Sequence, residues 1–186
     1  MREAMDDRGR FWLPVPDWRT ASLDGEGWRA RRIPDVRQTL VSGDLGAARS
    51  VLAPGLVEVG LWEIAESGAA VVRIARDRAL IVSISSPPMA APGWHDRFAV
   101  SPCDDLYAVL EISGASVADV VAEATAVDFT DGSRSAALLF AGVSCLLYRS
   151  GPQTARLHVE SPFAAYIWTW LAGIAARGAE TEGVYL

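Results

Sequence analysis

A chain of 186 residues that is 51% hydrophobic and 22% charged is long enough to form one domain with a substantial core. Its net charge of −6 excludes the basic surface on which nucleic-acid binding usually depends. All 17 basic residues are arginine, which excludes Schiff-base chemistry and a phosphate-loop lysine within this chain.

The cysteines and the N-terminus indicate a cellular compartment. Cys103 and Cys145 lie far apart in the sequence and form no CxxC pair, so a disulfide framework is not expected. The first residues, MREAMDDRGR, are charged and lack the apolar stretch of a signal peptide. No apolar run approaches the ~20 residues of a membrane span. We therefore expect a cytoplasmic protein without a membrane segment.

The first 37 residues differ from the rest of the chain. They contain Trp12, Trp18 and Trp28 among prolines and arginines, with no regular helix or strand period. Aromatic side chains are uncommon in disordered leaders, so this arm is expected to lie across a surface. Two alternatives remain open: the arm packs on its own domain, or it lies on a partner protein, where tryptophan and arginine are enriched.

A regular pattern begins near residue 38. A strand over 37–41 and a Ser-Gly turn precede a short helix over 44–53, and a strand over 106–112 with a second Ser-Gly turn precedes a helix over 115–124. These two strand–turn–helix units suggest an internal duplication.

The remaining segments are short, rich in β-branched residues and mostly alternating, as in antiparallel strands with one solvated face. They cover residues 56–66, 69–75, 78–85, 135–141, 143–150 and 155–161. A last helix begins at Pro162 and is predicted to stop at Gly178. We therefore expect an α+β domain over 38–178, with antiparallel sheets and helices on one face, followed by a short tail over 179–186.

The last helix carries more large rings than one face can bury. At about 100° per residue, Phe163, Ile167, Trp170 and Ile174 fall on one arc, which we predict to be the core face. Trp168 falls on a flank of small residues and is predicted to be covered by the arm or by another subunit. With the three tryptophans of the arm, Trp168 is thus a candidate partner contact.

Residues 93–105 are the one stretch that gathers reactive side chains: His95, Asp96, Cys103, Asp104 and Asp105. Their spacing matches no zinc pattern, since closed sites take four N/S ligands from close pairs. The other histidine, His158, lies within a predicted strand. No pair of carboxylates has the context of an acid/base couple. We expect an ordinary loop at 93–105, and neither catalytic nor metal-binding residues.

Three segments resemble the gamma subunit of heterotetrameric sarcosine oxidase, a family related to the folate-binding aminomethyltransferase (glycine-cleavage T-protein) fold. They are AVLEISGASVADVVAEATAVDF, DGSRSAALLFAGVSCLLYRSG and ARLHVESPFAAYIWTWLAGIA, taken in order along the chain. The resemblance covers roughly residues 38–178.

The resemblance implies an accessory subunit of an oxidoreductase complex in sarcosine catabolism and tetrahydrofolate metabolism. In such complexes the partner subunits, of alpha, beta and delta type, hold FAD, FMN, NAD and tetrahydrofolate. They convert sarcosine to glycine, hydrogen peroxide and methylenetetrahydrofolate. The resemblance implies that the gamma subunit itself is non-catalytic and carries no cofactor. Which N-methyl amine the complex oxidises is left open.

The alternative is a free-standing folate-binding or one-carbon-transfer protein. Such a protein needs a pocket carboxylate that binds a pterin, and Asp128 is the candidate by its position after the second helix. The competing interpretation of Asp128 is a turn or cap residue.

Overall fold

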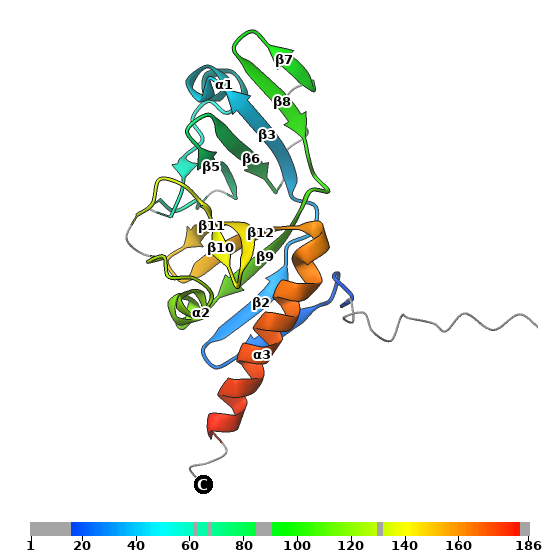
Figure 1. Cartoon of the computed structure of the whole chain (residues 1–186), viewed down its shortest axis with the longest axis vertical. Helices are drawn as coiled ribbons and strands as arrows, with labels where there is room; N and C mark the ends of the chain where they lie inside the picture. The colour runs from blue at the N-terminus through cyan, green and yellow to red at the C-terminus, as the bar shows by residue number, and fades with distance from the viewer. Residues whose placement is uncertain (1–15, 62, 67, 85–90, 130–131, 183–186) are drawn as a thin grey trace, which may run out of the picture.

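The computed structural model contains two six-stranded sheets and three α-helices (Figure 1). It describes residues 16–61, 63–66, 68–84, 91–129 and 132–182, with the side chains of 179–182 excepted. The first sheet has the strand order β1-β2-β9-β12-β11-β10 and is antiparallel throughout. The second has the order β4-β5-β6-β3-β8-β7, and one pair, β4 with β5, is parallel.

The strands of the first sheet are β1 (Ser22–Gly25), β2 (Trp28–Arg32), β9 (Tyr107–Ser113), β10 (Ala137–Phe140), β11 (Val143–Gly151) and β12 (Thr154–Glu160). The strands of the second are β3 (Arg37–Gly43), β4 (Glu58–Val59), β5 (Ala69–Ala75), β6 (Arg78–Ser83), β7 (Gly93–His95) and β8 (Phe98–Pro102). The helices are α1 (Leu45–Leu52), α2 (Val117–Ala124) and α3 (Ala164–Glu182), and a short 3₁₀ turn, η2 (Ser161–Phe163), precedes α3.

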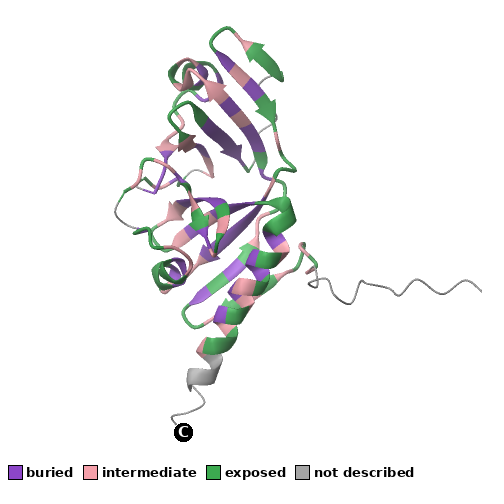
Figure 2. Ribbon diagram, in the orientation of Figure 1, coloured by how far each residue is buried: buried purple, intermediate pink, exposed green. Residues whose placement is uncertain are grey.

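Each sheet has its own helical cover, and a third apolar layer joins the sheets. Helices α2 and α3 pack on one face of the first sheet, and α1 packs on the second sheet. The layer between the sheets includes Val109, Leu146 and Tyr148 from the first sheet, and Val72 and Leu80 from the second. Burial is therefore concentrated in the strands, while the helices are buried along one side only (Figure 2).

The alternating segments of the sequence correspond to strands, and the α+β class is confirmed. The helices predicted over 44–53 and 115–124 are α1 and α2, and each follows a strand, but the two units lie in different sheets. The predicted strand over 56–66 is reduced to the two residues of β4. The predicted loop over 93–105 is wrong in its first part, because β7 and β8 form a hairpin there.

The predicted boundary at residue 37 is wrong for the described part of the arm. Strand β2 pairs with β9 over Arg29–Arg32, and β1 pairs with β2, so this hairpin completes one side of the first sheet. The side chain of Arg31 donates hydrogen bonds of 3.1 and 2.7 Å to Glu111 on β9. Trp28 is 6% exposed in the core beneath α2 and α3. Its partners were invisible in the sequence because they lie some 80 residues further along the chain.

The predicted orientation of α3 is also wrong. The buried face consists of Ala164, Ile167, Trp168, Leu171 and Ile174. Phe163, assigned to the core face, is 45% exposed, and Trp170 is only partly buried. At about 100° per residue the buried arc is rotated by roughly 70° from the predicted one.

The hairpin of β1 and β2 explains this rotation. It widens the sheet beneath α3, which makes more contacts with β1 than with any other strand. Trp18, which precedes the hairpin, packs edge-on against Trp168 with ring centroids 5.6 Å apart. Trp170 instead contacts Phe140 on the opposite side of the helix. Because the sequence analysis did not predict these two strands, it assigned the wrong ring of α3 to the buried face.

Two further features concern the ends of the predicted domain. Helix α3 continues through Gly178 to Glu182, so the predicted tail over 179–186 begins inside the helix. Within the described part of the chain, no helix is both long and apolar enough to span a membrane.

Truncation of Trp168 should destabilise the protein more than truncation of Trp170. For Trp168→Ala we expect a loss of about 3–5 kcal/mol in the free energy of unfolding, because an almost fully buried ring leaves a cavity. Trp170→Ala should cost clearly less, and Phe163→Ala, at an exposed position of the 3₁₀ turn that precedes this helix, serves as the control. Chemical denaturation followed by circular dichroism gives the three values. Equal losses for the two tryptophan variants would contradict this orientation of α3.

Candidate functional site

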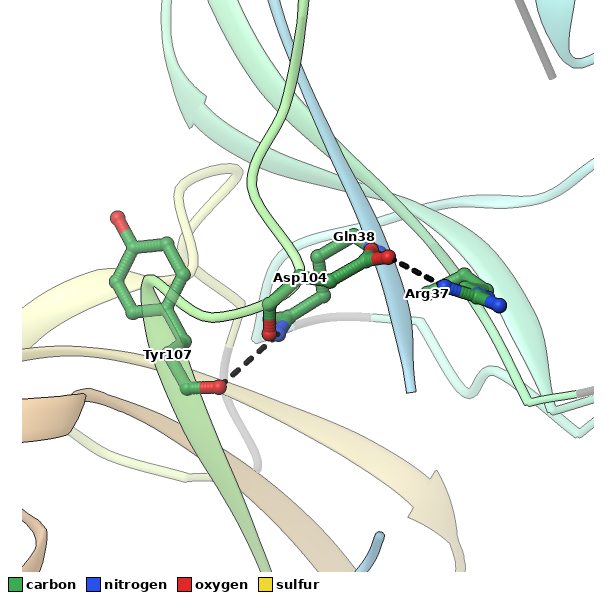
Figure 3. A network of polar contacts seen from close by, with 4 residues as sticks. All are labelled: Arg37, Gln38, Asp104 and Tyr107. Atoms are coloured by element: carbon green, nitrogen blue, oxygen red, sulfur yellow. Dashed lines mark hydrogen bonds and ion pairs between the residues drawn. The ribbon is translucent and has the colours of Figure 1, made fainter. Parts of the chain in front are cut away.

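A polar concave region lies where the chain passes between the two sheets. The connection from β2 to β3 crosses in one direction, and the connection from β8 to β9 crosses back. A cavity of about 280 Å³ lies between these connections, with Arg37, Gln38, Asp104 and Tyr107 in its wall. In Figure 3, Arg37 and Gln38 from β3 lie beside Asp104 from the β8–β9 connection, while Tyr107, at the start of β9, contributes its backbone oxygen and its ring points away.

Asp104 links the β8–β9 connection to strand β3. Its carboxylate accepts a hydrogen bond of 2.7 Å from the backbone N–H of Gln38 and another of 2.7 Å from Arg37. Desolvation alone would raise the pKa of Asp104, but the hydrogen bonds from Gln38 and Arg37 outweigh it, and the net shift is downward. Asp104 therefore stays ionised and bound at neutral pH, so it is not placed as a proton donor.

Gln38 is buried, with 1% of its surface exposed, and all of its side-chain groups are engaged. Its amide nitrogen donates to the backbone oxygens of Asp104, at 3.1 Å, and Tyr107, at 3.0 Å. These two bonds fix the orientation of the side-chain amide, and its oxygen is left to accept a further hydrogen bond. That oxygen lies 2.8 Å from Nδ1 of His158, on β12 of the other sheet.

The partners of the two ring nitrogens determine the tautomer of His158, and its burial determines its charge. Nδ1 donates to Gln38, so in the neutral ring Nε2 accepts, and its partner is the hydroxyl of Tyr148 at 3.2 Å. Complete burial, assisted by the nearby charge of Arg156, lowers the pKa of His158 from 6.5 to about 3. Burial also raises the pKa of Tyr148 to about 12, so the phenol keeps the proton that it donates. Both groups are therefore neutral and serve as hydrogen-bonding links.

The chemistry available at this junction is structural. The donors and acceptors of Gln38, Asp104, His158 and Tyr148 bind one another or the backbone across the sheets. Outside this network, no group of three or more His, Cys, Asp or Glu side chains among the described residues is placed to hold a metal ion.

The reactive types of residues 93–105 are dispersed. His95 stacks on Phe98 at the turn of the β7–β8 hairpin, and its Nε2 lies 2.9 Å from the backbone oxygen of Ala91. Cys103 lies beyond the other end of β8, at roughly 15 Å for a strand of this length. Burial raises the pKa of the Cys103 thiol, which makes it a weaker nucleophile.

Of the candidate partner contacts, Trp28 and Trp168 are built into the protein's own core. Trp18 is partly buried against Trp168, and the guanidinium of Arg32 lies 5.8 Å from the Trp18 ring centroid. Trp12 lies outside the described residues. The described arm, residues 16–37, thus packs on its own domain.

Asp128, the candidate for folate, is exposed on the surface after α2. It lines a shallow groove of about 480 Å³ together with Ala122, Val127 and other residues of this helix end. The sequence pattern did not identify Gln38, because a glutamine in a short strand is indistinguishable from an ordinary exposed residue until its partners are known.

Comparison with known proteins gives one family match. Residues 89–177, from the segment before β7 into α3, match the model of the sarcosine oxidase gamma subunit family. Over these residues the chain is similar to that family. This match includes both the β7–β8 hairpin and the strands that carry Tyr148 and His158.

A solved structure shows the same fold. It is the heterotetrameric sarcosine oxidase from Corynebacterium sp. U-96 in complex with pyrrole 2-carboxylate. One chain of that structure aligns with the present chain with a TM-score of 0.67 and 20% identity. The alignment covers 84% of the present chain and 88% of the chain in the solved structure. No curated protein matches the sequence.

The junction predicts a specific dependence of stability on pH. The pKa of His158 is lower in the folded chain (about 3) than in the unfolded chain (6.5), so unfolding binds a proton at intermediate pH. Stability from this group is complete above pH 6.5 and falls as the pH drops toward 3, by about 1.4 kcal/mol per pH unit. His158→Asn should flatten the dependence measured between pH 6.5 and 4.5. The other histidine supplies the control, and a slope lost in His95→Asn instead would contradict the assignment.

Removal of the Gln38 side-chain amide should loosen the connection between the sheets. Gln38→Leu leaves two backbone oxygens and the Nδ1 hydrogen of His158 without their partner, and each buried unsatisfied group costs about 1–3 kcal/mol. We expect a loss of roughly 3 kcal/mol or more in the free energy of unfolding. Gln153→Leu, in the β11–β12 turn, should change little. A loss as small as that of the control would show that the network does not hold the sheets together.

Proposed function

We propose that this chain is a non-catalytic accessory subunit of a heterotetrameric, flavin-dependent oxidase of sarcosine or a related N-methyl amine. The observation that carries the proposal is the family match over residues 89–177. The similarity of the fold to a chain of a heterotetrameric sarcosine oxidase supports it.

In this proposal the partners are alpha-, beta- and delta-type subunits, which hold FAD, FMN, NAD and tetrahydrofolate. The complex is cytoplasmic and yields glycine, hydrogen peroxide and methylenetetrahydrofolate from sarcosine. The gamma subunit supplies a rigid two-sheet body related to the aminomethyltransferase fold. The mutual engagement of Gln38, Asp104 and His158 supports this role, because these polar groups are used to hold the sheets rather than to contact a ligand.

The alternative of a free-standing folate-binding or one-carbon-transfer protein has less support. Pterin recognition requires a carboxylate within a pocket that excludes water. Asp128 is exposed, and the groove beside it is open to solvent.

Co-expression with candidate flavoprotein subunits tests the proposal. A tag on this chain should recover a yellow complex that consumes sarcosine and releases hydrogen peroxide, whereas the purified chain alone should be colourless and inactive. Absorbance spectra and a peroxide assay provide the measurements, with the untagged chain as the control for recovery. Stoichiometric flavin in the isolated chain, or folate binding that Asp128→Asn abolishes, would contradict the accessory role.

A further inference from the structure

The edge strand β7 carries an unusually exposed aromatic side chain. Trp94, the central residue of β7, is 71% exposed at the end of the molecule farthest from the C-terminal half of α3 (Figure 1). Tryptophan is among the residue types that contribute most to binding at protein interfaces. The described residues leave this ring uncovered, while Trp18, Trp28 and Trp168 are packed within the chain.

The Trp94 ring is held in one orientation by its own hairpin. Its Nε1–H donates a hydrogen bond of 2.8 Å to the backbone oxygen of Asp96 in the turn. The polar atom of the indole is thereby satisfied without a partner, and the surface left to solvent is the apolar ring. A side chain ordered in advance loses less conformational entropy on binding, which favours its use as an anchor.

The backbone of Trp94 is directed toward the open edge of the sheet. Asp96 and Arg97 form a two-residue turn, so the flanking residues His95 and Phe98 are the hydrogen-bonded pair of the hairpin. The next pair, Trp94 with Ala99, is then a non-hydrogen-bonded pair, and the N–H and C=O of Trp94 point away from β8. Among the described strands, β7 has a neighbour on that one side only.

The face beside the indole is lined by small side chains. Ala99 lies opposite Trp94 on β8, and Ser42 lies opposite Ala99 on β3. Residues paired across strands share a face of the sheet, so the indole of Trp94 lies at the end of a row of small side chains, Ala99 and Ser42. A bulky apolar side chain fits against the ring over these small neighbours.

Strand β10, at one edge of the first sheet, provides a comparison. Leu139 on β10 is 63% exposed, but the N–H of Ala137, two residues earlier on the same strand, already donates to the hydroxyl of Ser135. Part of that edge is therefore closed by the chain itself. The edge of β7 combines an outward backbone with a preordered aromatic anchor.

We propose that the open edge of β7 receives an extended strand from a partner subunit, whose apolar side chain packs against Trp94 over Ala99 and Ser42. This inference rests on the proposed function, since the family match and the similarity to a chain of a heterotetramer are what identify the partner as another subunit. A second copy of this chain would occupy the same edge, and the oligomeric state of the isolated chain distinguishes the two.

Binding of purified full-length variants to the remaining subunits of the complex tests the proposal. Trp94→Ala should weaken binding by about 30-fold or more, as for an interface hot spot. Trp94→Pro should weaken it further, because proline also removes the outward N–H while no bond to β8 is lost. Val51→Ala, at an equally exposed position on α1, and Leu139→Ala, on the edge of β10, should stay within about twofold of the unmodified chain.

Each result has a definite meaning. If the unmodified chain does not bind the other subunits, the proposed function fails. If it binds and Trp94→Ala binds equally well, the β7 interface is refuted while the proposed function stands. An effect of Leu139→Ala alone places the interface on β10. Equal effects of Trp94→Pro and Trp94→Ala refute strand addition. Sedimentation of the isolated chain as a dimer that Trp94→Ala disrupts would show that a second copy occupies the edge.

Discussion

The buried hydrogen bond between Gln38 and His158 connects the two sheets, and much of the fold depends on it. Each residue lies on a central strand of its own sheet, and the described strands are joined across the sheets by two connections. Gln38 also binds the second crossing through Asp104 and Tyr107. A single amide side chain thus joins both crossings to the opposite sheet. In a low-dielectric interior such a network holds one arrangement, because any other leaves polar groups unpaired.

The aromatic side chains fall into two groups: some pack within the chain, and others lie at the surface, where a partner could contact them. The hairpin of β1 and β2 brings Trp28 into the core, and the segment before it places Trp18 against Trp168. These rings stabilise the position of α3 on the first sheet. Among the described residues, the most exposed rings are those of Phe163 and Tyr166, around the start of α3, and of Trp94 on β7, and of these Trp94 is the most exposed.

The two halves of the chain differ in how directly they relate to known proteins. The family match covers β7 through most of α3, whereas the structural similarity extends over 84% of the chain. Part of the chain outside residues 89–177 is therefore related to the solved structure by shape rather than by the family pattern. Hydrogen bonds from Arg31 to Glu111 and from His158 to Gln38 join these segments to the family region.

The sequence by itself determined the local elements whose signals are local. Alternating β-branched residues marked β5, β6, β9, β11 and β12, and the Ser-Gly turns preceded α1 and α2, because the period of a strand or helix depends on neighbours within a few residues. The family resemblance, too, was visible in short ordered segments.

Only the tertiary structure decided which residues share a buried face. Arg31 and Glu111 are 80 residues apart and Gln38 and His158 are 120 apart, so no local pattern connects them. The burial of Trp168 rather than Trp170 followed from two strands beneath α3, SLDG and WRARR, which are too short for their alternation to stand out in the sequence. A helix exposes its rings according to what lies under it, and that surface is assembled from segments distant in the chain.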